Sequence, residues 1–145
     1  MICVDTGPLV ALFSPNDPDH AGCKAVLKAN RDQALYTTEA ALTEVMYMLM
    51  HGSQRKGLDA FIEFVVQDQI SVVPFDEKLR KRAFEYLAKY SDMKADYADA
   101  SLLSLAESFK ITKVFTLDFI DFRTYRIKSG LRYRSLDLLG SELLE

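Results

Sequence analysis

The sequence is poor in the residues that build disulfide and zinc sites, because it has only two cysteines and two histidines. Cys3 and Cys23 are too few for a disulfide framework and lack CxxC spacing, so we expect two core thiols in a reducing cytoplasm. His20 and His51 have no partner at metal-ligand spacing and are expected near the surface. No apolar run approaches about 18 residues and the first residues lack the regions of a signal peptide, which predicts neither export nor membrane insertion.

Motifs of several enzyme classes are missing as well. The chain contains no Gly-x-Ser-x-Gly elbow, no GxxxxGKS/T loop and no GxGxxG fingerprint. Serine-hydrolase, P-loop and dinucleotide-binding functions therefore lack their anchors. The net charge of -3 argues against a protein that coats nucleic acid through its overall charge, so any contact with nucleic acid must be local.

The apolar residues that are present predict one domain over residues 1–145 in which strands and helices alternate. Expected strands cover 1–4, 34–36, 70–73, 113–117 and 135–138. Expected helices begin at Pro8, Asp17, Thr37 or Thr38, Leu58, Asp76 and Asp96; the helix through Glu44 ends at His51-Gly52-Ser53, and residues 91–94 form a loop. Such alternation needs crossover helices between parallel strands. The fold class is therefore α/β, with a doubly wound, mostly parallel five-stranded sheet flanked by helices and the last strand at its edge.

Four acidic residues interrupt this apolar pattern. Asp5 and Asp118 directly follow predicted strands, whose carboxyl ends would meet at one edge of the sheet. Glu44 lies between apolar neighbours, although its helix face could point to water, and Asp99 lies near a helix start. Carboxylates gathered from distant segments repel one another unless a cation sits among them, and oxygen ligands suit Mg2+ or Mn2+. The pattern therefore predicts a divalent metal site suited to phosphodiester hydrolysis.

Each acid also has a purely structural alternative. Asp5 fits an N-cap or an Asx turn after a strand. Asp96 fits the N-cap of its helix, with Asp99 favoured by the helix dipole. Asp118 and Asp121 fit turn residues that cap a short helix. The metal-site hypothesis gains weight because all these acids fall at one predicted edge of one sheet.

The segment 123–134 interleaves basic residues with Tyr125 and Tyr133. Single-stranded RNA binding uses positive charge for phosphates and rings for unstacked bases, and a solvated basic loop is the alternative. The candidate RNA-binding residues are Arg123, Arg126 and Lys128. A second basic run, Arg80-Lys81-Arg82, is expected on the water-facing side of a helix.

Four motifs, in this order, resemble those of the PIN-domain nucleases, and the resemblance covers essentially the whole chain. They are Val4-Asp5-Thr6, Thr43-Glu44-Val45, Asp96-Tyr97-Ala98-Asp99-Ala100 and Thr116-Leu117-Asp118-Phe119-Ile120-Asp121-Phe122. The resemblance implies that Asp5, Glu44 and Asp99 bind Mg2+ or Mn2+. It implies Asp118 as the fourth, more variable acid, with Asp121 as the alternative. Outer positions would be Thr6, Asp96 and Thr116. Gly7 departs from the family, where many relatives carry serine.

The compact size is most similar to VapC-like toxin ribonucleases, which implies an RNA substrate, a homodimer and a small antitoxin. Met46, Met50, Phe61 and Phe64 could line a groove for an antitoxin helix or simply pack in the core. Two alternatives are a PIN-like module that only binds RNA or protein, and a PIN nuclease that processes RNA without being a toxin. A haloacid-dehalogenase phosphatase would need a second aspartate where Gly7 stands.

Overall fold

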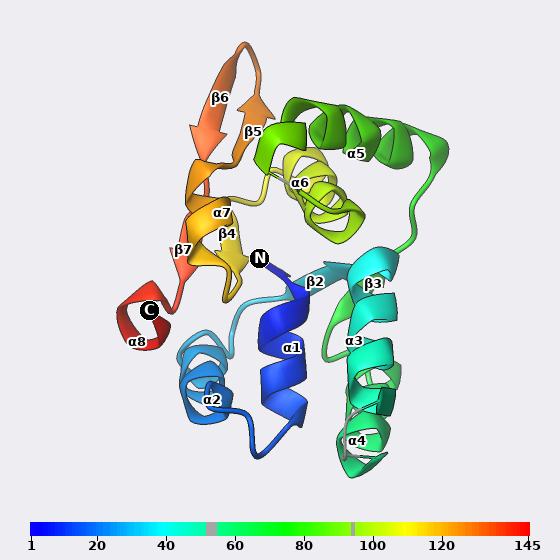
Figure 1. The fold of residues 1–145 in the computed structure, drawn as a ribbon, viewed down its shortest axis with the longest axis vertical. Helices are drawn as coiled ribbons and strands as arrows, with labels where there is room; N and C mark the ends of the chain where they lie inside the picture. Colours follow the sequence, from blue (N-terminus) through cyan, green and yellow to red (C-terminus); the bar gives the residue numbers. More distant parts are fainter. Residues whose placement is uncertain (52–54, 94) are drawn as a thin grey trace.

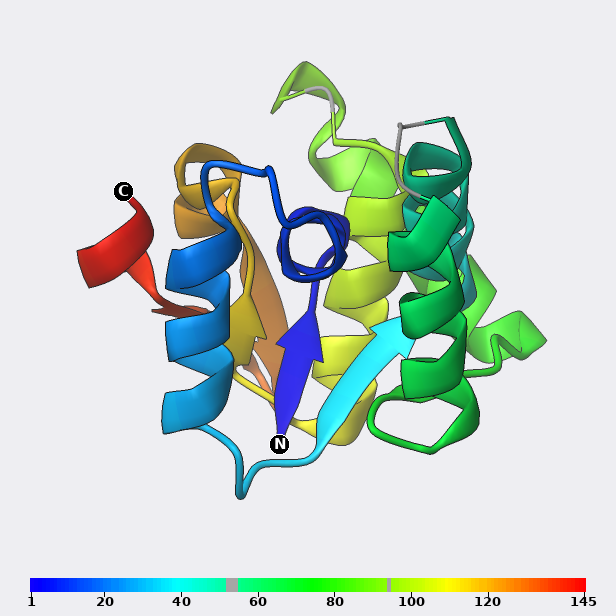
Figure 2. The same ribbon diagram turned by 90° about the horizontal axis from the view of Figure 1, so that it is seen from below.

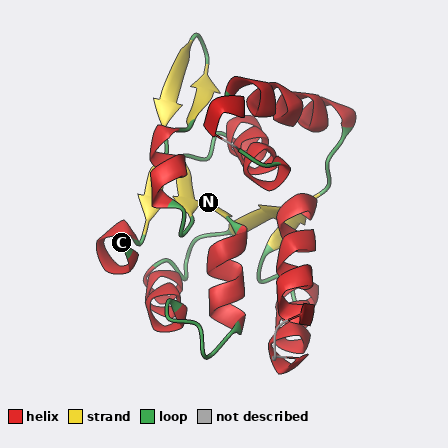
Figure 3. Ribbon diagram, viewed as in Figure 1, coloured by secondary structure: helices red, strands yellow, loops and turns green. Residues whose placement is uncertain are grey.

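Five parallel strands form a sheet with helices on both faces in a computed structural model, which describes residues 1–51, 55–93 and 95–145 (Figures 1 and 3). The elements in chain order are β1 (Ile2–Val4), α1 (Thr6–Phe13), α2 (His20–Ala29), β2 (Leu35–Thr38), α3 (Glu39–His51), α4 (Arg55–Val66), β3 (Ser71–Val73), α5 (Glu77–Lys89), the 3-10 turn η1 (Ser91–Met93), α6 (Tyr97–Phe109), β4 (Lys113–Phe115), α7 (Phe119–Thr124), β5 (Arg126–Ser129), β6 (Arg132–Ser135), β7 (Asp137–Leu139) and α8 (Ser141–Leu144). The predicted α/β class and parallel sheet are confirmed.

The strand order is β3-β2-β1-β4-β7, which places β1 at the centre. Ile2 pairs with Leu35 of β2 on one side, and Val4 pairs with Phe115 of β4 on the other. The chain first moves outward through β2 and β3 and then returns to the far side of β1. The strand order therefore reverses between β1 and β4, and side chains that follow these two strands meet there. In Figure 2, α1 starts at the tip of β1.

Two apolar clusters cover the two faces of the sheet, because successive residues of a strand point to opposite sides. Ile2 and Val4 pack in the cluster that includes buried residues of α1 to α4. Cys3 packs in the cluster formed with α5, α6 and β5. Cys3 and Cys23 are both buried free thiols, as expected, and burial raises the pKa of each to about 12.

The predicted helix starts at Thr38, Asp76 and Asp96 agree with the structure. Helix α1, however, begins at Thr6 rather than at Pro8, and α4 already includes Arg55, before the predicted start at Leu58. The hydroxyl of Thr38 accepts a hydrogen bond from the Ala41 N–H at 3.2 Å, which confirms Thr38 as a cap of α3. The second helix begins at His20 rather than at Asp17, because the Asp17 carboxylate accepts the Asp19 N–H at 2.9 Å and holds a turn before the helix. The predicted helix end at Gly52 and Ser53, and Lys94 of the predicted loop, lie outside the described residues.

The basic segment, for which a solvated loop was the alternative to RNA binding, is instead an antiparallel hairpin of β5 and β6, which rises beside α5 and α6 in Figure 1. The run Arg80-Lys81-Arg82 was expected on the water-facing side of a helix, and this expectation is wrong at Arg82. Its guanidinium forms hydrogen bonds of 3.0 to 3.1 Å with Glu107 of α6 and is only partly exposed. Helix α5 therefore turns Arg82 toward α6 rather than toward water.

Of the aromatic and methionine residues considered for a partner groove, Phe61 and Phe64 pack with Phe13, at ring-centroid distances of 5.3 Å each. Met46 packs against the same cluster, whereas Met50 is 58% exposed. Within the described residues, no helix combines the length and apolar character needed to cross a bilayer.

Replacing Phe61 by alanine should lower the free energy of unfolding by about 3 to 5 kcal/mol, because its fully buried ring leaves a cavity. Phe84→Ala is the matched control, since that ring is 54% exposed, and its loss should stay below about 1 kcal/mol. Urea unfolding followed by circular dichroism measures both. Equal losses would contradict this assignment of the core.

Candidate acidic active site

Asp5 lies where β1 ends and α1 begins. Its backbone N–H donates to the carbonyl of Phe115 at 2.9 Å, which ties the end of β1 to the end of β4. Asp5 occupies the N-cap position of α1, yet in the described chain its side chain makes no capping bond there. The carboxylate instead accepts a hydrogen bond from the Thr116 hydroxyl at 2.8 Å. The capping alternative therefore does not explain this aspartate, which is only 8% exposed.

The Thr116 hydroxyl links two of the predicted acids. It donates to Asp5 Oδ2 and accepts the backbone N–H of Asp118 at 3.0 Å. One carboxylate oxygen of Asp118 accepts the Asp121 N–H at 3.1 Å and so caps α7, as the structural alternative proposed. The oxygen of Asp118 that caps the helix is Oδ1. Asp121 lies three residues further along the chain and is partly exposed.

Glu44 reaches the same region from the side, although it belongs to α3. The hydroxyl of Thr6, which directly follows Asp5, donates to Glu44 Oε2 at 2.7 Å. Glu44 is partly exposed. A hydroxyl at position 6 therefore holds the α3 carboxylate beside the end of β1.

The start of α6 brings Asp96 and Asp99. Asp96 is the N-cap, and its side chain accepts the Asp99 N–H at 2.9 Å, which confirms its structural role. Asp99 Oδ2 accepts a hydrogen bond from the Tyr125 hydroxyl at 3.0 Å. The Asp99 carboxylate is thus held by a residue from the segment that follows α7.

The acids of this group destabilise one another's charged forms. Burial, opposed by bonds from Thr116 and Thr6 and reinforced by the charges of Asp96 and Glu44, raises the pKa of Asp5 to about 6. Burial, together with the charges of Asp5, Asp96 and Asp118, raises the pKa of Asp99 to about 7. Burial and repulsion from Asp118 also raise the pKa of Asp121.

An open cleft of about 580 Å³ borders this group, and its lining includes Asp5, Asp118, Ile120 and Glu145. Carboxylates of this kind fit a hard divalent cation, which takes oxygen ligands and would relieve their repulsion. Among residues 1–51, 55–93 and 95–145, however, no three Asp, Glu, His or Cys side chains are arranged to hold one ion. The chemistry of these oxygen donors nevertheless suits a divalent cation.

The structure also contains polar residues at this edge that the sequence did not reveal. Tyr125 was expected to offer its ring to RNA, and this expectation is wrong, because the side chain is fully buried. Phe122, three residues earlier, is also buried. Residues three apart share one face of a helix, so this spacing was a sequence signal that Tyr125 faces inward. Thr38 and Ser101 share a buried hydrogen bond of 2.7 Å that joins the end of β2 to α6.

The three residues predicted to bind RNA differ in their surroundings. Arg123 is paired with Glu145 near the cleft. Arg126 Nη1 donates to the backbone carbonyls of residues 123, 124 and 125 at 2.6 to 3.0 Å, and so closes the end of α7. Lys128 is exposed on β5.

Comparison with known proteins identifies the family of this fold. The family model described as "PIN domain" matches residues 2–128. The chain belongs to the PIN domain family. Ribonuclease VapC26 of Mycobacterium tuberculosis is 27% identical to it over 135 residues, which cover 90% of this chain and 96% of VapC26.

Solved structures share this PIN-domain fold. The crystal structure of VapC20 of M. tuberculosis, a toxin that cleaves the sarcin-ricin loop, superposes with a TM-score of 0.71 at 21% identity, covering 79% of this chain and 87% of that one. VapBC2 of Rickettsia felis bound to promoter DNA gives 0.68 at 13% identity over 96% and 99% of the two chains. A toxin-antitoxin complex of Klebsiella pneumoniae gives 0.62 at 18% identity over 86% and 92%.

Asp99→Asn should stabilise the metal-free PIN domain near pH 8. The unfolded chain loses the Asp99 proton near pH 4 and the folded chain near pH 7, so the folded state binds more protons between these values. Stability of the wild type therefore falls as pH rises through this window. The variant has no ionisable group at this position, so its free energy of unfolding near pH 8 should exceed that of the wild type by about 1 to 2 kcal/mol. This gain is smaller than the full pKa shift of Asp99 would give, because water screens a partly exposed carboxyl.

Chemical denaturation at pH 4, 6 and 8 without divalent ions measures the effect. Asp32→Asn, at an exposed aspartate, is the matched control and should show no comparable gain. A gain for Asp99→Asn that is equal at pH 4 and pH 8 would contradict the assigned repulsion.

Proposed function

We propose that this PIN domain is a metal-dependent endoribonuclease that hydrolyses RNA phosphodiester bonds and acts as the toxin of a toxin-antitoxin module. The observation that carries the proposal is the gathering of Asp5, Glu44, Asp99 and Asp118 where β1 and β4 end. Burial and mutual repulsion already raise the pKa of Asp5 and Asp99 there. Support also comes from VapC26, a relative named as a ribonuclease.

Mg2+ or Mn2+ is the proposed cofactor, held by Asp5, Glu44 and Asp99, with Asp118 as fourth acid. Asp118 is favoured over Asp121 because it borders the cleft with Asp5 and adds to the repulsion at Asp99. A bound ion would lower the pKa of a water and stabilise the charge on the phosphate oxygens. Asp121 remains the alternative ligand, and Asp96 acts by capping α6.

The residues around the acids have separable roles in this proposal. The hydroxyls of Thr6 and Thr116 orient Glu44 and Asp5 while leaving their charge in place. They donate hydrogen bonds and carry no positive charge, so the site keeps its attraction for a cation. The cleft beside Asp5 and Asp118 gives an RNA strand access to these carboxylates.

The β5–β6 hairpin supplies positive charge for the RNA backbone. Of the three predicted RNA-binding residues, Lys128 is the one that lies exposed on the hairpin, and it is the one proposed to contact phosphate. Arg123, on α7, is exposed but paired with Glu145, so RNA phosphate would compete with that carboxylate. Arg126 contributes mainly by closing α7, since its Nη1 is bound to three carbonyls.

A homodimer and a small antitoxin are the proposed protein partners. Large apolar side chains of α3 and α4 that are 39 to 74% exposed support a protein-binding surface. They are Tyr47, Met48, Met50, Ile62 and Val66. One solved neighbour is a toxin-antitoxin complex, and another is VapBC2 bound to promoter DNA. A short neighbouring gene for a DNA-binding antitoxin would separate a toxin from an RNA-processing PIN nuclease.

Asp5→Asn and Asp99→Asn should each lower the rate of RNA cleavage by at least about 100-fold, because each removes a ligand charge. Cleavage of labelled RNA in Mn2+, with and without chelator, measures the loss, and Mn2+ calorimetry measures binding. Asp32→Asn is the control and should cleave normally. If the folded wild type neither binds Mn2+ nor cleaves RNA, the result would favour the alternative of a PIN-like module that only binds RNA or protein.

Lys128→Ala should weaken RNA binding and reduce the slope of log affinity against log salt by roughly 1, because one phosphate contact is lost. Lys24→Ala, at an exposed lysine of α2, is the matched control. Fluorescence anisotropy with a single-stranded RNA in Ca2+ at several salt concentrations measures both. If both variants show the same slope of log affinity against log salt, the hairpin does not contact RNA through Lys128.

A further inference from the structure

Tyr125 connects the acidic site to the hairpin. It lies between α7 and β5, is fully buried, and donates its phenol hydrogen to Asp99 Oδ2 at 3.0 Å. Its ring packs against those of Phe122 and Tyr90, with centroid distances of 5.1 and 4.8 Å. Phenylalanine would fill the same space, so the hydroxyl has a separate role, which is its bond to Asp99.

That bond restricts the Asp99 side chain. The backbone N–H of Asp99 is fixed by the Asp96 cap at 2.9 Å, and the phenol holds Oδ2. With one oxygen held, rotation of the carboxylate is limited and Oδ1 is the oxygen left for another partner. A phenol is protonated at neutral pH, so the Tyr125 hydroxyl is the donor of this bond.

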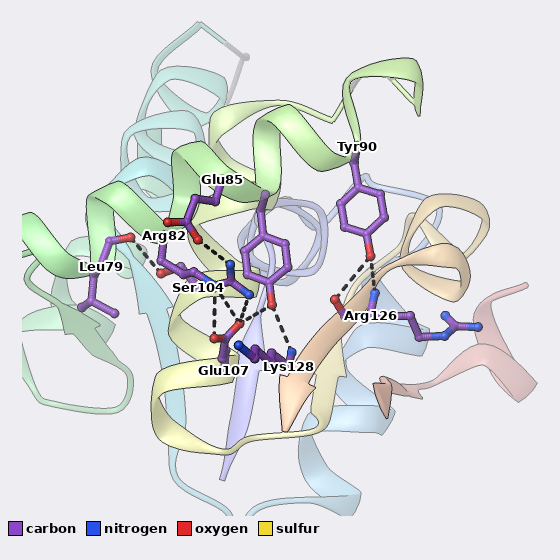
Figure 4. Close-up of polar contacts among 9 residues, drawn as sticks. Leu79, Arg82, Glu85, Tyr90, Ser104, Glu107, Arg126 and Lys128 are labelled. Atoms are coloured by element: carbon purple, nitrogen blue, oxygen red, sulfur yellow. Dashed lines mark hydrogen bonds and ion pairs between the residues drawn. The ribbon is translucent and has the colours of Figure 1, made fainter. Parts of the chain in front are cut away.

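Two tyrosine hydroxyls fix the backbone just after Tyr125. One belongs to Tyr86 of α5 and the other to Tyr90, the residue that directly follows α5 and is labelled in Figure 4. The Tyr90 hydroxyl accepts the Arg126 N–H at 2.8 Å and donates to the Arg126 carbonyl at 3.3 Å. The Tyr86 hydroxyl accepts the Lys128 N–H at 3.2 Å and donates to Glu107. The outer edge of β5 thus pairs with side chains of α5 rather than with another strand.

The tyrosine contacts on α5 are themselves anchored. Glu107 accepts hydrogen bonds from Tyr86 and from Arg82, and Arg82 also pairs with Glu85 (Figure 4). Although burial opposes it, the bonds from Arg82 and Tyr86 hold the pKa of Glu107 below its usual range. This charged group joins α5 to α6, the helix that carries Asp99. The position of Tyr125 relative to Asp99 is therefore determined by α5, α6 and β5 together.

We propose that Tyr125 is a positioning residue of the metal site, which orients Asp99 through its hydroxyl and is itself kept in place by Tyr90 at the end of α5. This inference rests on the proposed function, because it assigns Asp99 as a metal ligand. Removing a hydrogen bond that orients a metal ligand typically lowers metal affinity by 10- to 100-fold. Tyr125 contacts the ligand and neither the substrate nor the ion.

Tyr125→Phe should raise the Mn2+ dissociation constant of the full chain about tenfold, measured by calorimetry on metal-free protein. The Mn2+ concentration needed for half-maximal RNA cleavage should rise in parallel, while kcat at saturating Mn2+ changes less than about twofold. The urea midpoint of the metal-free variant separates this effect from general destabilisation. Tyr36→Phe is the matched control, because that ring packs against Phe109 at the opposite end of α6, and its Mn2+ affinity should equal that of the wild type.

Tyr90→Phe gives a second, independent test. It removes both hydrogen bonds to Arg126 but leaves the Tyr125–Asp99 bond intact, so Mn2+ affinity should fall by a smaller factor in the same direction. If the wild type binds Mn2+ and cleaves RNA while Tyr125→Phe and Tyr90→Phe bind Mn2+ equally well, the inference is overturned and the proposed function stands. If the wild type binds no Mn2+, both are overturned.

Discussion

The constraint on which the site depends is the repulsion among carboxyl groups held together at one end of the sheet. Protein folding normally separates such charges or pairs them with cations. Here Asp5, Glu44 and Asp99 each accept a hydrogen bond from a neutral hydroxyl, which orients the carboxyl group and leaves its charge uncompensated. The stability of the folded chain is therefore lower at this edge than its packing alone would give. This uncompensated negative charge would attract a cation.

Much of the fold follows from features that a single sequence displays. Apolar runs of three or four residues separated by helical periodicity predict parallel strands joined by crossovers, and the placement of Asp5 and Asp118 directly after such runs predicts that they are neighbours. The Val4–Phe115 pairing of β1 with β4 agrees with this. The caps at Thr38, Asp76 and Asp96 were also identifiable, because a capping side chain acts on a backbone N–H only a few residues away.

The hairpin and its connection to Asp99 could not be predicted, because they depend on contacts between distant segments. Strand β6 is exposed along its length and lacks the alternation of apolar and polar residues that indicates a strand. Its partner β5 is held by hydroxyls of α5, about 40 residues earlier in the chain. Tyr125 lies among basic residues, which suggested exposure, although its helical spacing from the apolar Phe122 indicated an inward face. Arg82 was misassigned because its partner Glu107 is 25 residues away.

The hydrogen bond between Thr116 and Asp5 joins residues 111 positions apart, and it has a consequence for the time at which the site forms. Closing so long a segment carries a large loss of chain entropy, and strand pairings of this range form slowly. During synthesis on the ribosome, β1 emerges long before β4, the strand that must lie beside it. The carboxylates therefore remain apart while most of the polypeptide is being made, and a nascent chain has no assembled site.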